Sequence, residues 1–229
     1  MFYPSRFIGT VAFCALLSGG MASADNFNIS NTELGTYSLI NSLGQSLNGG
    51  TAILGAFKSN SWSYDMASNK WNFESHSYTQ DQLTYSDLVN MGNSFTNTLD
   101  QTGTVTNGKF NIEGGNYQTS PPSSNSPIYL MVTGEDGDLA VFVFRSISDD
   151  PSLEDSLLTY NDVSLSGSEL LNLWLAPKDS VSAPDYYAEC ILGNVDPINN
   201  TVQLLIPEPA TATLSLLGLA ALMMRRRRK

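Results

Sequence analysis

The chain has 229 residues, of which 41% are hydrophobic and only 14% are charged. Small polar residues take the place of the missing charge, with 20 Asn, 29 Ser and 17 Thr. This composition excludes a coiled coil, a polytopic membrane protein and a highly charged disordered chain. The net charge of -11 argues against nucleic acid as a partner.

The first 24 residues have the pattern of a secretory signal peptide. Arg6 gives a positive start, residues 7–17 are apolar, and Ala22-Ser23-Ala24 is a cleavage site for signal peptidase. We therefore predict export, with Asp25 as the first residue of the mature chain. The alternative is an uncleaved anchor or a buried core helix, but an apolar run of this length is short for a membrane span.

The C-terminal end has a second ordered pattern. Pro207-Glu208-Pro209 is followed by an apolar run over residues 210–224, and the chain then ends in a basic cluster of Arg225, Arg226, Arg227, Arg228 and Lys229. A helix over the apolar run would be about 22 Å long, less than the ~30 Å hydrocarbon core of a bilayer. Because basic residues stay on the cytoplasmic side, the sequence predicts a C-terminal membrane helix with the passenger outside.

This tail resembles the PEP-CTERM sorting signal of Gram-negative bacteria, which is also called an ice-binding-protein C-terminal domain. The resemblance covers residues 206–229. It implies that the membrane-embedded protease exosortase recognises Pro207-Glu208-Pro209 and removes the helix, after signal peptidase has cleaved the other end. It also implies anchoring in the cytoplasmic membrane first, and then a final location at the cell surface or in the extracellular matrix. The alternative is a single-span tail anchor that is not cut.

Residues 25–205 form the predicted passenger domain. It contains five basic and 21 acidic residues, a net charge of -16 that favours solubility and cation binding. Cys190 is its single cysteine, so no internal disulfide can form and the fold must depend on its core. The apolar sequence around Cys190 predicts a buried, unreactive thiol.

Alternating hydrophobicity predicts β structure through most of the passenger. Asn107-Gly108 lies between two alternating arms, which predicts a type I′ hairpin over residues 104–112. A second hairpin is expected from residues 128–133 and 139–144, and the continuously apolar second strand should lie centrally in its sheet. Further strands are expected at residues 37–43, 51–57, 162–165, 170–175, 187–192 and 201–206.

One short helix is expected over residues 79–90, with Thr79 or Asp81 as its N-cap. Residues 118–126 contain two adjacent prolines and several serines, and are expected to form an exposed loop. Short strands separated by Gly, Asn and Ser turns indicate a mainly β fold, specifically a single β-sandwich or jelly-roll-like domain.

Catalytic signatures are scarce in this chain. His76 is the single histidine, which excludes a two-histidine zinc motif, and no G-x-S-x-G elbow or nucleotide-binding glycine motif is present. We therefore predict no catalytic residues, with His76 as an exposed loop or strand residue. The one cofactor considered is Ca²⁺, since Glu135, Asp136 and Asp138 cluster in one turn and offer oxygen ligands. Asp and Gly also favour tight turns for backbone reasons alone.

Four aromatic residues form the most suggestive pattern. Trp62 alternates with Tyr64, and Trp71 with Phe73, around a turn at residues 65–69. This predicts a hairpin with all four rings on one face. If exposed, the rings can stack on sugars as a glycan-binding site, whereas buried rings would form a wall of the core. The buried interpretation is favoured, because large apolar side chains seldom gather in the open.

The sequence thus predicts an exported, non-catalytic protein that is a structural or adhesive component of the envelope or extracellular matrix. The first alternative is a carbohydrate-binding surface module that uses the aromatic face, with or without calcium. The second is a glycan hydrolase with two carboxylates roughly 5 to 9.5 Å apart across a cleft.

Overall fold

The computed structural model describes residues 26–116, 125–148, 155–160, 162, 171–181 and 185–206. Their regular secondary structure is mainly β-strand with one α-helix, which confirms the predicted fold class at that level. The predicted signal peptide and sorting tail, most of the predicted loop at 118–126 and most of the strand at 162–165 lie outside the described residues. Among the residues described, no helix is long and apolar enough to span a membrane.

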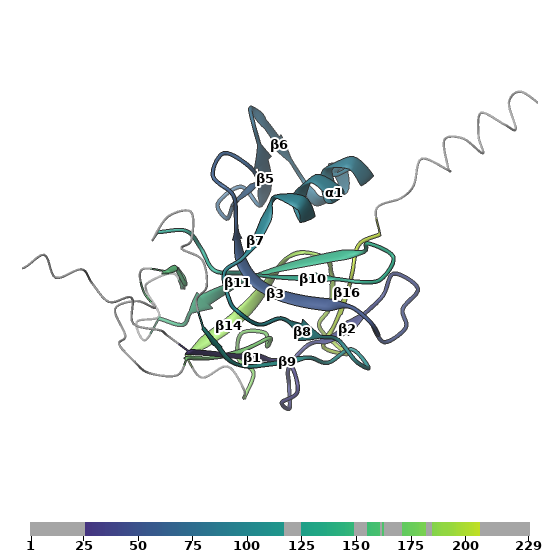
Figure 1. Ribbon diagram of the computed structural model, residues 1–229, viewed down its shortest axis with the longest axis vertical. Helices are drawn as coiled ribbons and strands as arrows, with labels where there is room; N and C mark the ends of the chain where they lie inside the picture. The colour runs from purple at the N-terminus through teal and green to yellow at the C-terminus, as the bar shows by residue number, and fades with distance from the viewer. Residues whose placement is uncertain are drawn as a thin grey trace, which may run out of the picture.

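A seven-stranded sheet forms the centre of the molecule (Figure 1). Its strands are β3 (Thr51–Phe57), β7 (Phe95–Asn97), β8 (Gly103–Thr104), β10 (Tyr129–Thr133), β11 (Leu139–Ser146), β12 (Ser156–Leu157) and β14 (Tyr186–Leu192). The strand order is β12-β11-β10-β3-β7, while β14 also pairs with β11 and β8 with β3. All of these pairs are antiparallel.

Strand β11 is buried along six consecutive residues, from Leu139 to Phe144. With β10 it forms the second predicted hairpin, in which Met131 pairs with Val141. Successive side chains of a strand point to opposite faces, so Phe142 enters one hydrophobic core and Val141 the other. The prediction of a central strand covered on both faces is therefore confirmed.

Two small sheets supply the larger core on one side of the central sheet. In the first, β1 (Asn26–Ser30) lies between β13 (Leu171–Trp174) and β9 (Asn111–Asn116). In the second, β16 (Thr201–Gln203) lies between β15 (Asn194–Asp196) and β2 (Ser38–Ile40). Their buried side chains join those of the central sheet in one cluster that includes Phe27, Ile29, Leu39, Ile112, Val202, Leu54, Leu130 and Phe142.

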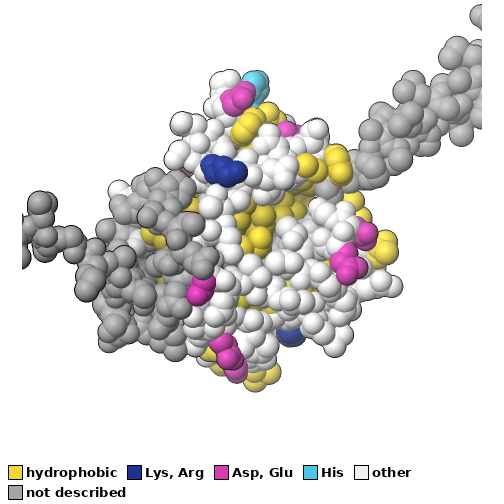
Figure 2. Space-filling model, in the orientation of Figure 1, with side chains coloured by type: hydrophobic (Ala, Val, Ile, Leu, Met, Phe, Trp, Pro, Cys, Tyr) yellow, Lys and Arg dark blue, Asp and Glu magenta, His cyan; other side chains and the backbone are white. Residues whose placement is uncertain are grey.

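A hairpin module and the helix cover the opposite face (Figure 1). The hairpin module is the sheet of β4 (Ser63–Asp65), β5 (Lys70–Phe73) and β6 (His76–Tyr78). The 3-10 turn η1 (Gln80–Gln82) and then the helix α1 (Tyr85–Ser94) follow it in the chain. The second core joins both parts through Trp62, Trp71, Leu88, Met91, Tyr129, Met131, Val141 and Val143. Figure 2 shows hydrophobic side chains in the hollow below this module.

The helix begins later than predicted. Thr79 caps only the 3-10 turn, and Leu83 then returns to an extended conformation. Thr84 caps α1: the Asp87 backbone N–H donates to its hydroxyl at 3.3 Å, and its own N–H donates to the Asp87 carboxylate at 2.8 Å. The predicted N-cap at Thr79 or Asp81 is wrong because two capping boxes follow each other, and the second one starts the helix.

The predicted turn at Asn107-Gly108 is confirmed, since both residues have positive φ, 51° and 72°. Thr106 and Lys109 pair across it, with the Thr106 N–H donating to the Lys109 carbonyl at 2.8 Å. Beyond this pair the two arms separate, because β8 joins β3 in the central sheet and β9 joins β1. The turn therefore connects two sheets instead of closing a long hairpin.

Gly55 allows β7 to lie against β3, and its replacement tests this packing. A Cβ at Gly55 would overlap the Thr96 carbonyl oxygen and lie 2.8 Å from the Phe95 ring. We expect Gly55→Ala to lower the free energy of unfolding by about 3 kcal/mol, measured by urea denaturation. Gly92 in α1 is the matched control, because a Cβ there meets nothing within 4 Å. Gly92→Ala should raise stability by about 0.5–1 kcal/mol, and a similar loss in both variants would contradict this account.

Candidate functional site

The aromatic hairpin forms as predicted, with both of its tryptophans buried. Tyr64 pairs with Trp71 across β4 and β5, and the turn between the strands is closed through Asn69 at φ 52°. Trp62 is only 2% exposed and Trp71 is fully buried. Trp62 stacks on Phe73 with ring centroids 4.7 Å apart. Trp62 and Trp71 therefore belong to the second core, as in the buried interpretation, and the partly buried Tyr64 and Phe73 pack against it.

The acidic turn between β10 and β11 does not gather its carboxylates. Asp138 is 2% exposed, and burial raises the pKa of its carboxyl group. Glu135 instead folds over Gly49. Across the residues described, no three His, Cys, Asp or Glu side chains form a group that could hold a metal ion. The geometry thus lends the calcium prediction at Glu135, Asp136 and Asp138 no support.

His76 and Cys190, whose side chains the sequence singled out, lie in different sheets. His76 is exposed in β6, as predicted. Cys190 lies in β14, where burial raises the pKa of its thiol to about 12. Its Sγ–H donates to the Leu192 carbonyl at 3.3 Å. A thiol with so high a pKa is not a nucleophile at neutral pH.

A charged network at β11 and β14 joins two of the few basic side chains to Asp155. Lys178 forms an ion pair with the Asp155 carboxylate, and Tyr187 donates to the same oxygen at 3.0 Å. The bond from Lys178, followed by that from the Ser148 N–H, lowers the pKa of Asp155 to about 2. Arg145 bonds the Asp155 carbonyl and pairs with Glu189 at 3.1 Å. Because these groups bond one another, the network ties β11 and β14 to the segment around Asp155.

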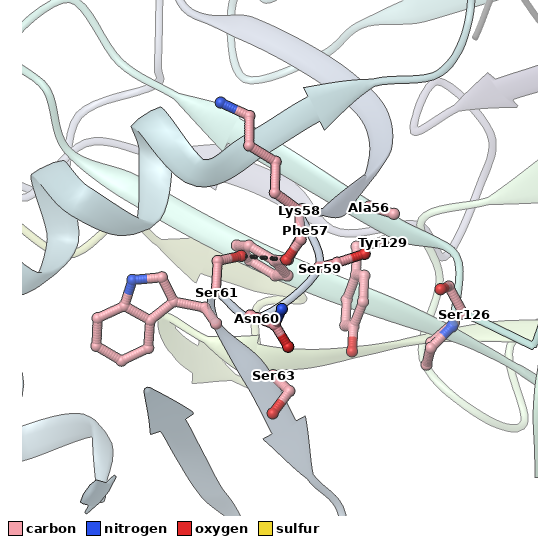
Figure 3. A pocket seen from close by; sticks show the side chains of 11 residues that line it. Ala56, Phe57, Lys58, Ser59, Asn60, Ser61, Ser63, Ser126 and Tyr129 are labelled. Carbon is pink, nitrogen blue, oxygen red and sulfur yellow. Dashed lines mark hydrogen bonds between the residues drawn. The ribbon is translucent and has the colours of Figure 1, made fainter. Parts of the chain in front are cut away.

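A pocket lined by described residues lies at the junction of the hairpin module and the central sheet (Figure 3). It has a volume of about 360 Å³, in the lower part of the range of small-molecule sites. The end of β3, the loop that follows it and the start of β10 form its walls. The lining residues are Ala56, Phe57, Lys58, Ser59, Asn60, Ser61, Trp62, Ser63, Ser126, Pro127 and Tyr129.

The pocket combines an aromatic floor with neutral polar walls. Phe57 and Tyr129 are each 6% exposed and meet edge to face, with centroids 5.2 Å apart. Lys58 is the only ionisable lining residue besides Tyr129. Its ammonium donates to the Asn93 carbonyl at 3.1 Å, at the end of α1, and Figure 3 shows its side chain pointing away from Asn60 and Ser63. Ordinary turn residues form most of the wall, so the sequence carried no signal for this site.

The two buried tryptophans, Trp71 and Trp62, differ in whether the indole N–H has a hydrogen-bond partner, and a pair of substitutions can test what that bond contributes to stability. Trp71 Nε1 donates to the Ile191 carbonyl at 3.2 Å, whereas Trp62 Nε1 is buried with no partner among the described residues. We expect Trp71→Phe to lower the free energy of unfolding by about 1 kcal/mol more than Trp62→Phe, because only the first loses a hydrogen bond. Urea denaturation measures both. Equal losses, or a larger loss at Trp62, would contradict the assignment.

The low pKa of Asp155 predicts an acid-dependent loss of stability. A carboxyl pKa of about 2 in the folded state lies below the ordinary value near 3.9. The ionised form therefore stabilises the fold above about pH 4, and this contribution disappears as the pH falls through about 2. We expect the melting temperature of Asp155→Asn to be lower than wild type at pH 6 and to approach it near pH 2. Exposed Glu74→Gln is the control, and a constant difference for Asp155→Asn would refute the network.

Comparison with known proteins adds no relative. No family model matches the chain, no curated protein matches it, and no solved structure matches it. The tail's resemblance to PEP-CTERM signals is neither supported nor contradicted by this result. Function is therefore inferred from the residues of this chain and their arrangement.

Proposed function

We propose that the chain is an exported PEP-CTERM protein with a non-catalytic structural or adhesive role at the bacterial cell surface or in the extracellular matrix. One observation carries this proposal: the folded core ends just inside both predicted cleavage sites. Phe27 is fully buried two residues after Asp25, and Leu204 is 1% exposed three residues before Pro207. Both processing events would thus leave the core complete.

The two ends of the core are each held by β pairing. Strand β1 is the middle strand of its sheet, with β13 on one side and β9 on the other. At the other end, Leu205 exchanges two backbone hydrogen bonds with Leu139, each 2.9 Å long. Ile206 then lies 39% exposed. A signal that starts at Pro207 would therefore begin where the chain has reached the surface, within reach of a membrane protease.

The environment of the reactive groups favours a non-catalytic role. The thiol of Cys190 is held protonated by burial, and Asp155 is committed to its network. No Asp or Glu lines the pocket described above, so this pocket does not supply the two carboxylates that a glycan hydrolase would need. We infer that the passenger is a β-sandwich-like domain held together by its core and not by a disulfide. Such a domain suits a role in contact with other components of the cell surface.

The masses of the native protein show directly whether signal peptidase and exosortase have cleaved the two ends. We expect surface material to begin at Asp25 and to lack Arg225 to Lys229, as measured by intact-mass and terminal-peptide mass spectrometry. Glu208→Ala should retain the basic cluster, whereas the exposed-site control Glu33→Ala should be processed normally. A wild-type protein that keeps both Met1 and Lys229 would refute export and sorting.

A further inference from the structure

We propose that the pocket between the hairpin module and β10 binds a neutral sugar unit. This adds a binding activity to the surface role proposed above. Trp62 lines the edge of the pocket, but the polar groups proposed to bind the sugar are those of Asn60, Ser63 and Tyr129, not the stacked face of Trp62 and Trp71. The inference rests on three features of the pocket: a preformed polar wall, a hydroxyl at its floor, and the lack of a charge directed into it among its described lining residues.

The polar wall is preformed by the loop after β3. Asn60 holds a left-handed conformation at φ 60°, which Asn tolerates better than most residues. The Ser61 N–H donates to the Lys58 carbonyl at 3.1 Å, and the Ser61 hydroxyl donates to the same oxygen. This turn leaves the exposed side chains of Asn60 and Ser63 beside the pocket (Figure 3). A ligand would therefore meet an amide and a hydroxyl whose backbone is already fixed.

The floor adds a phenol that is fixed by its neighbours. Burial raises the pKa of the Tyr129 hydroxyl to about 12, and the nearby Tyr64 backbone lowers this pKa by a smaller amount. The hydroxyl therefore stays protonated at neutral pH and keeps a proton that it can donate. Figure 3 shows this hydroxyl, the Asn60 amide and the Ser63 hydroxyl around the same space. The Phe57 ring fixes the orientation of the phenol from behind.

This combination suits a sugar better than an ion or a hydrocarbon. A sugar ring has hydroxyls that both donate and accept, and apolar C–H edges that contact aromatic rings. Lys58 is bound to the end of α1, so no cation is offered to a carboxylate or phosphate. The chain's net charge of -11 also repels anions. A pocket of about 360 Å³ accommodates one sugar residue with part of a second.

Saturation-transfer-difference NMR on the full chain tests the proposal, in micelles of dodecylphosphocholine, which contains no sugar. The probes are maltose, cellobiose, lactose and chitobiose, with digalacturonate as the acidic comparison. We expect at least one neutral disaccharide to bind and digalacturonate not to bind. The natural ligand could be a residue within a polysaccharide or a free soluble sugar, and methyl glycosides of the binding sugar distinguish the two. Binding of the methyl glycoside indicates a residue within a polysaccharide, whereas binding of the free sugar alone indicates a soluble ligand.

Variants then locate the binding. Asn60→Gly keeps the left-handed backbone and removes the amide, and Ser63→Ala removes an exposed hydroxyl. We expect the double variant to bind about tenfold more weakly, since each change removes one hydrogen bond. Asn200→Gly is the matched control, because Asn200 also has positive φ (49°) and does not line the pocket; it should bind as wild type does. Melting temperatures of all variants confirm their folding.

Several results would overturn the proposal: no transfer to any neutral probe, stronger transfer to digalacturonate, or equal weakening by Asn200→Gly. A failure here is distinguishable from a failure of the proposed function. Loss of the sugar site leaves the terminal masses of the native protein unchanged, whereas unprocessed ends refute export without affecting sugar binding.

Discussion

The burial of β11 on both faces is the constraint on which the rest of the structure depends. A strand with six buried residues in succession needs an apolar layer on each side of its sheet. The sheets around β1 and β16 supply one layer, and the hairpin module with α1 supplies the other. The hairpin module is therefore needed to cover this face of the central sheet. The pocket forms beside the loop that connects β3 to the module.

Features encoded by neighbouring residues could be predicted from the sequence. Asn107-Gly108 identified a turn that needs two positive φ angles, and the run from Val141 to Phe144 identified a central strand. The 65–69 turn between two aromatic arms was equally visible. Each depends on contacts within about ten residues, where turn chemistry and side-chain alternation decide the conformation.

Features that depend on distant partners could not be predicted. Strand β1 was missed, because its pairing with β13 joins residues that lie about 140 positions apart, as with Asn28 and Asn172. The start of the helix was misplaced because Thr79 and Thr84 both have capping partners three residues later. The pocket joins Asn60 to Tyr129 only through the pairing of β3 with β10. Sequence patterns carry no register for such pairs.

The bond pair between Leu139 and Leu205 has a mechanical consequence. If the C-terminal helix holds the chain to the membrane, any tension on the tether enters the domain through Leu205 and then β16. Val202 of β16 pairs in parallel with Leu39 of β2, so the load runs along the strands and across a ladder of bonds that must yield together. A pull along β16 would therefore load its parallel pairing with β2 in shear, so that these backbone hydrogen bonds would bear the force together instead of breaking one at a time.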